Sequence, residues 1–380
     1  MPKPQSKIEK LIYELCPNGV EFKELGKVCK VLRGKRLTKK ELSNEYEYPV
    51  FHGGLIPLGL YNKYNRKANQ TMIINTGSVG EVVWSPVDFW SSDGTFTVET
   101  PDYINDRFIY FFLKCQETYL KSQKREGGVP TIDREAVEKI KIPLPPLAIQ
   151  EEIVKIINSF KELEAEMEAE MEARKKQYEY YYKKLLTSNN SVHITLNEVG
   201  KVSMCKRIFK NETLASGDIP FYKIGTFGKV PNAFISQKIY DEYRKKFSFP
   251  KKGDVLLSAS GTIGRRVIYN GEPAYFQDSN IIWIDNDESK ILNKFLYYLY
   301  ATIEWKTEGG TIQRLYNDNL KKVKIPVPPL AEQERIVSIL DKFDTLVNDI
   351  SVGLPAELSA RRSQYEYYRG KLLTFNEYVK

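Results

Sequence analysis

The feature that most constrains this 380-residue chain is a long segment that occurs twice. Residues 142–187 recur at residues 325–374, and the copies begin with IPLPPLAIQEEIV and IPVPPLAEQERIV, which agree at ten of thirteen positions. The far ends of the copies match as well, because QYEYY and KLLT occur in both. This duplication fixes the plan of the chain, and the other segments are arranged around the two copies.

Each copy is predicted to be a helix that begins directly after a pair of prolines. Pro145-Pro146 and Pro328-Pro329 cannot continue a helix from upstream, because proline fixes φ and has no backbone N–H. Apolar residues then follow at three- and four-residue spacing with one stutter, which is the pattern of a coiled-coil seam. The predicted packing residues are Ile153, Ile156, Phe160, Leu163, Met167, Tyr178, Tyr181 and Leu185 in the first copy, and Ile336, Leu340, Phe343, Val347, Ile350, Tyr365, Tyr368 and Leu372 in the second.

A narrow apolar stripe is unstable without a partner, and the chain supplies two matching stripes. We therefore expect the two helices to pack on each other as an antiparallel pair. The alternative is two unrelated amphipathic helices, each packed on its own domain.

The second copy is four residues longer than the first, which is about one helical turn. The additional residues lie near Gly353 and Pro355, and both residue types destabilise a helix interior. We predict a kink or break there, whereas the first helix is predicted to run unbroken through EAEMEAEMEA. The glutamates of that stretch point all round the helix and are interpreted as a solvated surface.

The positive charge is concentrated outside the two helical segments. Residues 1–141 hold 22 basic against 18 acidic side chains, and residues 189–324 hold 21 against 14. The helical segments are slightly acidic, with 7 against 9 in residues 142–188 and 7 against 8 in residues 325–380. Such a partition fits globular parts that contact a polyanion and helices that contact other protein.

The two segments outside the helices are predicted to be similar domains of mixed α and β structure. YPVFHGG at residues 48–54 resembles IPFYKIG at residues 219–225, and NTGSVGEVV at residues 75–83 aligns with ASGTIGRRV at residues 259–267. The predicted organisation is therefore α+β. It has a first domain at residues 1–141, a central helical region at 142–188, a second domain at 189–324 and a distal helical region at 325–380.

Basic loops and glycine turns are the candidate nucleic-acid contacts. The turns GSVG and GTIG are expected to join two strands and to leave backbone N–H groups and hydroxyls free for phosphate oxygens. A purely structural hairpin is the alternative for both turns, and an arginine after such a turn could reach a guanine. The candidate DNA-binding residues are Arg33, Lys35, Arg36, Lys39, Lys40 and Ser78 in the first domain, and Lys206, Arg207, Lys210, Ser260, Thr262, Arg265 and Arg266 in the second.

Several classes of function lack their motifs. No GxxxxGK[ST] phosphate-binding loop is present, and both Pro-Pro pairs have aliphatic neighbours, unlike the polar-Pro-Pro-aromatic loop of an amino-methyltransferase. The four cysteines are scattered and the only histidines are His52 and His193, which argues against structural zinc, disulfides and a Ser-His-Asp site. The missing motifs predict a non-catalytic protein. The sequence also predicts neither a membrane span nor a signal peptide, and hence a cytoplasmic location.

The repeated PPLAxQExI helix start, the QYEYYxxKLLT helix end and the two basic variable domains resemble the specificity subunit of type I restriction-modification systems. The similarity spans the full length, with one departure, since Ser78 stands where the second turn has the family's usual threonine. The resemblance implies a non-catalytic subunit that reads an asymmetric, bipartite site in double-stranded DNA, one half with each target recognition domain.

The resemblance also implies partners for the helical regions. Modification subunits, two of them expected, would dock there and use S-adenosylmethionine, and restriction subunits would use ATP and Mg²⁺, so that this chain itself binds no cofactor and no metal. Two other classes stay open on the residues alone. One is a stand-alone DNA-binding scaffold or repressor, which copurification with neighbouring gene products would separate from the first interpretation. The other is a nuclease with a hidden carboxylate site, which incubation of the purified chain with Mg²⁺ and DNA would detect.

Overall fold

The computed structural model describes residues 6–125, 129–187, 191–309 and 313–378. The chain forms two compact units. Unit 1 comprises Met1–Glu168 and Leu358–Lys380, and unit 2 comprises Ala169–Glu357. Each unit holds one globular domain and part of the helical segments, and each is described here by itself.

The domain of unit 1 is built on three small sheets. A four-stranded antiparallel sheet has the order β2-β8-β5-β6, a three-stranded sheet has the order β4-β3-β7, and β1 pairs with β9. The strands are β1 (Phe22–Glu24), β2 (Lys30–Arg33), β3 (Tyr48–Phe51), β4 (Gly59–Tyr61), β5 (Gln70–Ile74), β6 (Val82–Ser85), β7 (Trp90–Ser91), β8 (Thr95–Glu99) and β9 (Lys141–Pro143). The helices are α1 (Lys7–Leu15), α2 (Leu25–Val28), η1 (Lys39–Glu41), α3 (Asp106–Cys115), α4 (Glu117–Ser122) and α5 (Arg134–Glu138).

The domain of unit 2 repeats all three sheets. Their orders are β11-β17-β14-β15, β13-β12-β16 and β10-β18, and the parallel pair β12–β16 matches the parallel pair β3–β7. The strands are β10 (Val192–Thr195), β11 (Lys201–Ser203), β12 (Ile219–Tyr222), β13 (Phe234–Ile235), β14 (Val255–Ser258), β15 (Arg266–Ile268), β16 (Tyr275–Phe276), β17 (Ile281–Asp285) and β18 (Lys324–Val327). The helices are α7 (Leu196–Val199), η2 (Lys210–Glu212), α8 (Gln237–Lys246), α9 (Asn293–Leu299) and α10 (Asn317–Lys321). The predicted α+β class and the internal duplication are confirmed.

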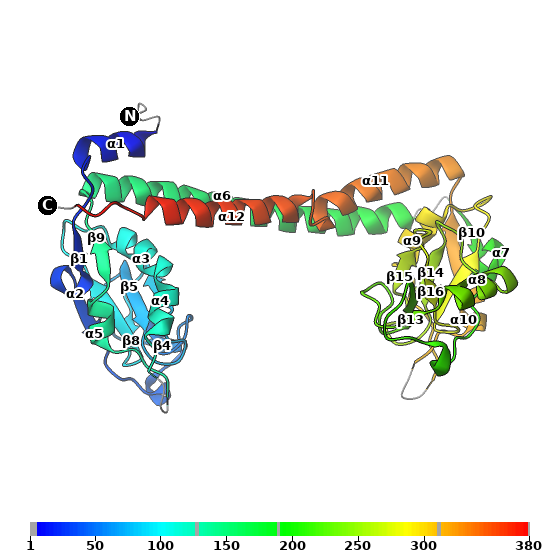
Figure 1. The fold of residues 1–380 in the computed structure, drawn as a ribbon, viewed down its shortest axis with the longest axis horizontal. Helices are drawn as coiled ribbons and strands as arrows, with labels where there is room; N and C mark the ends of the chain where they lie inside the picture. The colour runs from blue at the N-terminus through cyan, green and yellow to red at the C-terminus, as the bar shows by residue number, and fades with distance from the viewer. Residues whose placement is uncertain (1–5, 126–128, 188–190, 310–312, 379–380) are drawn as a thin grey trace. The chain divides into compact units, whose positions relative to one another are not determined.

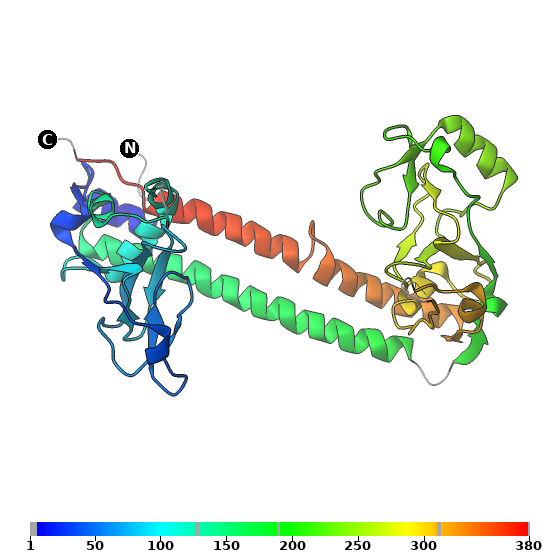
Figure 2. The same cartoon turned by 90° about the horizontal axis from the view of Figure 1, so that it is seen from below.

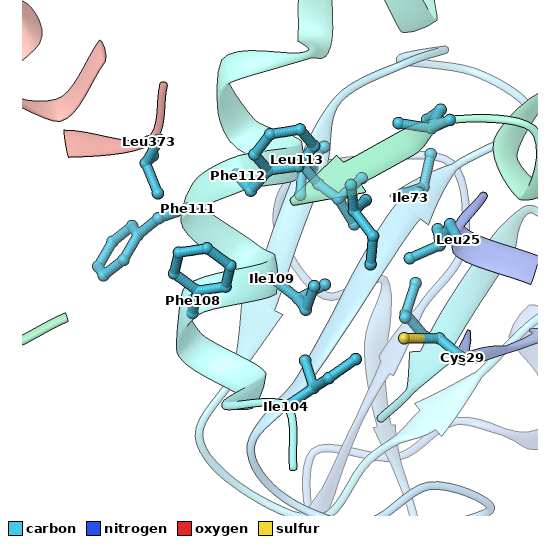
Figure 3. Packing of buried hydrophobic residues seen from close by; sticks show 14 of the residues in the cluster. Leu25, Cys29, Ile73, Ile104, Phe108, Ile109, Phe111, Phe112, Leu113 and Leu373 are labelled. Atoms are coloured by element: carbon cyan, nitrogen blue, oxygen red, sulfur yellow. The ribbon is translucent and has the colours of Figure 1, made fainter. Parts of the chain in front are cut away.

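The core of unit 1 lies between α3 and its central sheet. Ile109 and Leu113 of α3 lie toward Ile73 of β5 (Figure 3), and these three side chains and Phe108 are at most 1% exposed. The Asn105 side chain caps this helix by accepting hydrogen bonds from the N–H groups of its first turn. Because α3 is both capped and buried, its start is a fixed point of the domain.

The helical segments begin where the prolines predict. The first helix, α6, is Leu147–Leu186 and runs without a break, while the second copy is divided into α11 (Leu330–Asn348) and α12 (Leu354–Leu372). The predicted break near Gly353 is confirmed. Within unit 1, α12 lies alongside the first part of α6 in both views (Figure 1 and Figure 2).

The pairing is antiparallel in unit 1. Phe160 of α6 stacks on Tyr368 of α12 with ring centroids 5.8 Å apart, and further along α6 Glu164 accepts from Arg362 at 2.6 Å. The same guanidinium also contacts Glu168. Residue numbers rise along α6 as they fall along α12, so the two helices run in opposite directions.

In unit 2 the second part of α6 packs on α11. The Phe343 ring stacks on Tyr178 and Tyr181, with centroids 6.0 Å away in each case. The buried core that includes Leu186, Ile336 and Leu340 continues this contact into the domain. The helices therefore pack both on each other and on the domain of the same unit, so the two arrangements that the sequence left open are combined.

Two predicted packing positions are wrong. Leu163 is 51% exposed and Ile350 is 84% exposed. The contact face of α6 runs through Ile157, Phe160 and Glu164, so Leu163 falls beside it, and Arg362 meets carboxylates there rather than an apolar side chain. Ile350 lies in the interruption between α11 and α12, where it has no helical partner face.

Among the other predicted positions, burial is uneven. Ile153, Ile336, Leu340 and Val347 are buried, and Tyr181 and Tyr368 are just over one-third exposed while remaining stacked on phenylalanines. The remaining predicted positions are half-buried: Ile156, Phe160, Met167, Tyr178, Leu185, Phe343, Tyr365 and Leu372. The pair is therefore a seam with an aromatic surface at its edges rather than a continuous apolar core.

One buried glutamine in each copy ties the start of the helix to the domain before it. The Gln150 amide donates to the carbonyls of Pro145 at 2.8 Å and Tyr103 at 3.2 Å, and its oxygen accepts from the Asn105 N–H at 2.8 Å. Because Asn105 caps α3, this side chain fixes α3 against the start of α6.

Gln333 makes the same three contacts in unit 2. Its amide donates to the carbonyls of Pro328 at 2.7 Å and Lys290 at 2.9 Å, and its oxygen accepts from the Leu292 N–H at 2.8 Å. Leu292 directly precedes α9, as Asn105 precedes α3. Both copies have a glutamine four residues after the second proline, Pro146 or Pro329. The same set of three hydrogen bonds, here called the glutamine clamp, explains why.

Replacing either glutamine with alanine is expected to lower the free energy of unfolding by about 2–4 kcal/mol, because buried backbone groups lose their partners. Urea titration of the full-length chain measures the effect. Gln364 of α12 is exposed, so Gln364→Ala is the matched control and is expected to change stability by less than about 0.5 kcal/mol. Equal effects of the exposed and buried substitutions would contradict the clamp.

A second pair of substitutions tests the break in the second copy. A Cβ on Gly353 would lie 2.3 Å from the Thr345 carbonyl oxygen and 2.7 Å from that of Leu346, whereas a Cβ on Gly370 meets nothing within 4 Å. Gly353→Ala is therefore expected to destabilise the chain by about 1–3 kcal/mol. Gly370→Ala is expected to stabilise α12 by about 0.5–1 kcal/mol, because alanine has the lower conformational entropy cost in a helix. Thermal unfolding of both variants should show shifts of opposite sign.

Candidate nucleic-acid interface

The basic loop of unit 1 follows β2, and its backbone is fastened to β7. The Lys35 N–H donates to the Ser91 carbonyl at 2.9 Å, and the Trp90 indole donates to the Lys35 carbonyl at 2.8 Å. A Cβ on Gly34 would lie 2.0 Å from the Ser92 carbonyl oxygen, so only glycine permits this close approach. The loop is therefore held at a defined place on the domain.

The cations of this loop face solvent. Within the described part of the chain, none of the five has a carboxylate oxygen within 4.0 Å. They are Arg33, Lys35, Arg36, Lys39 and Lys40. The short helix η1 is closed by Thr38 and Glu41, and hydrogen bonds from Thr38 lower the pKa of the Glu41 carboxyl. A rigid loop with unneutralised positive charge is suited to contact an anionic backbone.

The glycine turn of unit 1 joins β5 to β6 as predicted. Gly77 has φ +93°, and a Cβ there would lie 2.3 Å from the Gly53 carbonyl oxygen. The expectation of free backbone N–H groups is wrong, because the Ser78 N–H donates to that same carbonyl at 2.8 Å and the Gly80 N–H donates to Ile74 at 2.9 Å. The side chain of Ser78 is exposed, so only its hydroxyl fits the predicted role.

The turn of unit 2 joins β14 to β15, and here one predicted contact is wrong. Ser260 is 5% exposed, and its hydroxyl donates to Asn280 Oδ1 at 2.7 Å instead of remaining free. The physical reason is that the turn folds onto the segment before β17, which supplies the half-buried acceptor Asn280. Thr262 is exposed at the tip of the turn and keeps the predicted position.

The two arginines after this turn do not reach outward as predicted. Arg265 Nη1 donates to the Phe227 carbonyl at 2.9 Å. The Arg266 guanidinium lies 4.6 Å from the centre of the Tyr297 ring, and its Nε is buried. Arg266 begins β15, whose neighbour α9 carries Tyr297, so this side chain faces the interior of unit 2 rather than a ligand.

Arg266 lies in a tyrosine cluster that joins the domain of unit 2 to α6. Burial raises the pKa of Tyr182 to about 12, and the Tyr182 hydroxyl donates to the Tyr298 carbonyl. The Tyr298 hydroxyl contacts Asp341 of α11, and burial together with this contact raises its pKa. The arginine therefore belongs to the junction between domain and helices.

The basic residues after β11 have three different environments. Lys206 is exposed and lies over the Phe247 ring, and Lys210 is exposed at the start of η2. Arg207 is held, because its Nε lies 2.8 Å from Asp278 Oδ2. Lys206 and Lys210 suit the predicted phosphate contacts, while the position of Arg207 is defined by a carboxylate.

The sequence prediction missed an acidic residue that each domain places two positions after its short parallel strand. Asp93 follows β7, and its Oδ1 lies 3.3 Å from Nδ1 of His52. Asp278 follows β16 and pairs with Arg207. The aligned segments YPVFHGG and IPFYKIG are the signal that could have located these acidic residues. His52 and Lys223 occupy matching positions in them, just after β3 and β12, and these strands pair with β7 and β16.

Asp278 lies in a polar depression of about 320 Å³ on the domain of unit 2. Four cations and one carboxylate contribute to its lining, together with two amide side chains. The charged residues are Arg207, Lys210, Lys223, Arg314 and Asp278. Since the turn that carries Ser260 borders this depression through Asn280, the turn and the basic residues belong to one surface.

The described residues contain no group of three or more His, Cys, Asp or Glu side chains placed to hold a metal ion. All four cysteines are free thiols, and burial raises the pKa of Cys29 and Cys205 to about 12. Over the same described ranges, no helix is both long enough and apolar enough to cross a membrane.

The sequence of the chain matches the model of one protein family. The family model for the type I restriction modification DNA specificity domain matches twice, at residues 17–173 and 189–360. The chain belongs to the family of type I restriction-modification specificity subunits. Members of this family are non-catalytic subunits, and the chain is not an enzyme.

Two relatives illustrate the similarity. A Haemophilus influenzae protein named as a type I restriction enzyme specificity subunit is 46% identical over 374 residues, covering 94% of this chain and 96% of the relative. The Escherichia coli EcoR124I/EcoR124II specificity subunit is 30% identical over 387 residues, covering 94% of each chain. Among solved structures, the HsdS subunit from Thermoanaerobacter tengcongensis has the same fold with a TM-score of 0.56, at 17% identity over 94% of this chain and 97% of that one.

The exposed loop makes a testable prediction about salt dependence. Replacing Lys39 and Lys40 with alanine is expected to weaken binding to all duplex DNA sequences equally. The slope of log K against log salt is expected to fall by about 0.9 for each phosphate that no longer meets a lysine. Filter binding or fluorescence anisotropy over a salt series measures both effects.

The control for the loop substitutions lies on another helix of the same unit. Lys10 of α1 is also exposed, so Lys10→Ala is the matched variant and should leave the salt slope unchanged. A change in base preference instead of salt slope would contradict the assignment of Lys39 and Lys40 to phosphates.

Proposed function

We propose that the chain reads an asymmetric, bipartite site in double-stranded DNA, with one half-site read by the domain of residues 1–141 and the other by the domain of residues 189–324. The observation that carries this proposal is that the two domains share one backbone fold but have different polar side chains beside their short parallel strands, β7 and β16. His52 and Asp93 lie there in one domain, and Lys223, Asp278 and Arg207 lie there in the other. Two copies of one fold with different polar residues suit two different half-sites.

The charge distribution supports DNA as the ligand. Both domains are basic and both helical regions are slightly acidic. The loop cations of unit 1 are exposed, and so are Lys206 and Lys210 of unit 2, which suits phosphate contacts by each domain. The exposed hydroxyls of Ser78 and Thr262 extend the same surfaces along the glycine turns.

The helical regions, residues 142–188 and 325–380, set the spacing between the half-sites in this proposal. The single helix α6 has 40 residues, which corresponds to about 60 Å at ~1.5 Å per residue. That length exceeds one turn of DNA, about 35 Å, which is the usual separation of two half-sites on one face of a duplex.

The same regions dock the enzymatic subunits. Tyr180 and Tyr367 occupy the same position of the repeated QYEYY motif and are 59% and 63% exposed. Exposed tyrosines at matching places on a helix surface suit protein interfaces, in which aromatic residues are enriched. Two similar surfaces support two modification subunits, which use S-adenosylmethionine, with restriction subunits that use ATP and Mg²⁺ joining them. In this proposal the chain contributes recognition and no cofactor.

The proposed spacing role predicts the result of a length change. Inserting four residues after Met167 of α6, together with four after Ser359 of α12, lengthens both helices by about 6 Å. Each half-site is expected to stay the same, while the gap between them grows by about one to two base pairs at ~3.4 Å per pair. Sequencing of modified adenines across the host genome, with and without the altered gene, gives the site and the gap.

The control for this experiment changes composition without length. Replacing Glu166 and Glu170 with alanine removes two exposed charges and should leave both half-sites and the gap as they are. An unchanged gap in the lengthened protein would contradict the spacing role. Loss of all modification in cells without the gene is the result that the recognition role requires.

A further inference from the structure

We propose that Arg207, oriented by Asp278, reads a guanine in the half-site bound by the domain of unit 2. This inference rests on the proposed function and deepens it, because it assigns a base-reading residue and the base that it selects. It begins from the ion pair between these residues. The Arg207 side chain is 61% exposed, while Asp278 is 17% exposed and forms the inner member of the pair.

The geometry of the pair decides which edge of the guanidinium is available. Asp278 Oδ2 engages Nε of Arg207 at 2.8 Å. The two terminal nitrogens form the end of the guanidinium beyond Nε, and this side chain is 61% exposed, so we assign that end to the ligand. Two parallel N–H donors match the O6 and N7 acceptors of guanine in the major groove. A carboxylate that holds the side chain also reduces the entropy lost when the base is bound.

The surroundings of Arg207 are rich in donors, and the one carboxylate of the lining, Asp278, is paired with Arg207 itself. The Gln277 amide oxygen accepts from the Ile224 N–H at 2.8 Å, and the Asn280 amide oxygen accepts from the Ser260 hydroxyl at 2.7 Å. Each of these amide oxygens already accepts a hydrogen bond within the domain, while Lys210 and Arg314 line the depression as donors. Lys223 adds a further donor to the same lining. Guanine presents two acceptors in the major groove, whereas adenine presents an acceptor and a donor, so this lining favours guanine.

The domain of unit 1 keeps the carboxylate and changes its partner. Asp93 contacts His52, which follows β3, whereas Asp278 contacts Arg207, which follows β11. A shared acidic residue thus orients a different basic side chain in each domain. This difference gives the two domains different readers at one place in a common fold, and it assigns the guanine to the half-site of unit 2 alone.

The test is selection from a library of randomised duplex DNA, using the full-length chain together with the subunits that copurify with it. The wild-type chain is expected to enrich a split site with a guanine at one position of one half. Arg207→Lys keeps the charge and loses the forked donors, so it should lose preference for that guanine by about five- to 150-fold. Asp278→Asn should weaken the same preference, and the other half-site should be unchanged in both variants.

Two controls sharpen the result. Lys245→Ala removes an exposed cation from α8 of the same domain and should leave every position of the site unchanged. A duplex with 7-deazaguanine at the assigned position lacks the N7 acceptor, so it should bind the wild-type chain less tightly and the Arg207→Lys chain no differently. Enrichment of the unaltered half-site by each variant shows that the variant is folded.

The outcomes separate this inference from the function on which it rests. If the wild-type chain enriches a split site and Arg207→Lys enriches the same bases, the assignment of Arg207 is overturned while the proposed function stands. If Arg207→Lys lowers recovery of all sequences equally, Arg207 contacts phosphate and the assignment is again overturned. If the wild-type chain enriches no sequence, the proposed function fails and this inference fails with it.

Discussion

Two buried glutamine side chains hold the architecture of this chain together. Gln150 and Gln333 each join the proline-led start of a helix to the backbone just before a domain helix, with three hydrogen bonds in each case. A buried amide with every bond satisfied allows one geometry, because any displacement leaves backbone groups without partners. Each glutamine therefore fixes the start of its helix on the domain, and the buried core residues of α6 and α11 continue that contact.

The helices add a second, softer contact. Aromatic rings stack between the helices, Phe160 on Tyr368 in unit 1 and Phe343 on Tyr178 in unit 2. Where the contact face of α6 is no longer apolar, Arg362 pairs with carboxylates. Aromatic rings that are half-buried contribute to packing and still offer surface to another protein. This combination suits the proposed function, in which the helices set the spacing of the domains and dock the enzymatic subunits.

The two domains share one fold and differ in the polar residues that the proposed function assigns to DNA reading. Their three sheets have matching orders, and their glycine turns and short parallel strands lie at matching places. The differences include added helices, such as α8 in unit 2, and the side chain that pairs with the shared carboxylate, which is His52 in one domain and Arg207 in the other. Because the backbone is set by the buried residues, this paired side chain can vary while the fold is kept.

Much of the fold could be predicted from the sequence, and less of the candidate site. The repeat, the helix starts after the prolines and the break near Gly353 follow from local rules on proline, glycine and periodicity, and all three are confirmed. The outward reach of Arg266 was predicted wrongly, because the face of β15 that α9 covers is not a local property. The prediction of a free Ser260 hydroxyl was wrong for the same reason, because its acceptor Asn280 lies twenty residues away in the sequence.

The sequence alone determined that this chain holds one plan twice, with paired helices and two basic domains, since repeats, spacing and charge are properties of the residues in order. Only the tertiary structure decided which cations are free and which are held. Arg207 and Asp278 lie 71 positions apart, and their pairing depends on β11 and β16 being brought to one surface of the domain. Pairing across such a distance is set by sheet order and packing, which the order of residues does not display.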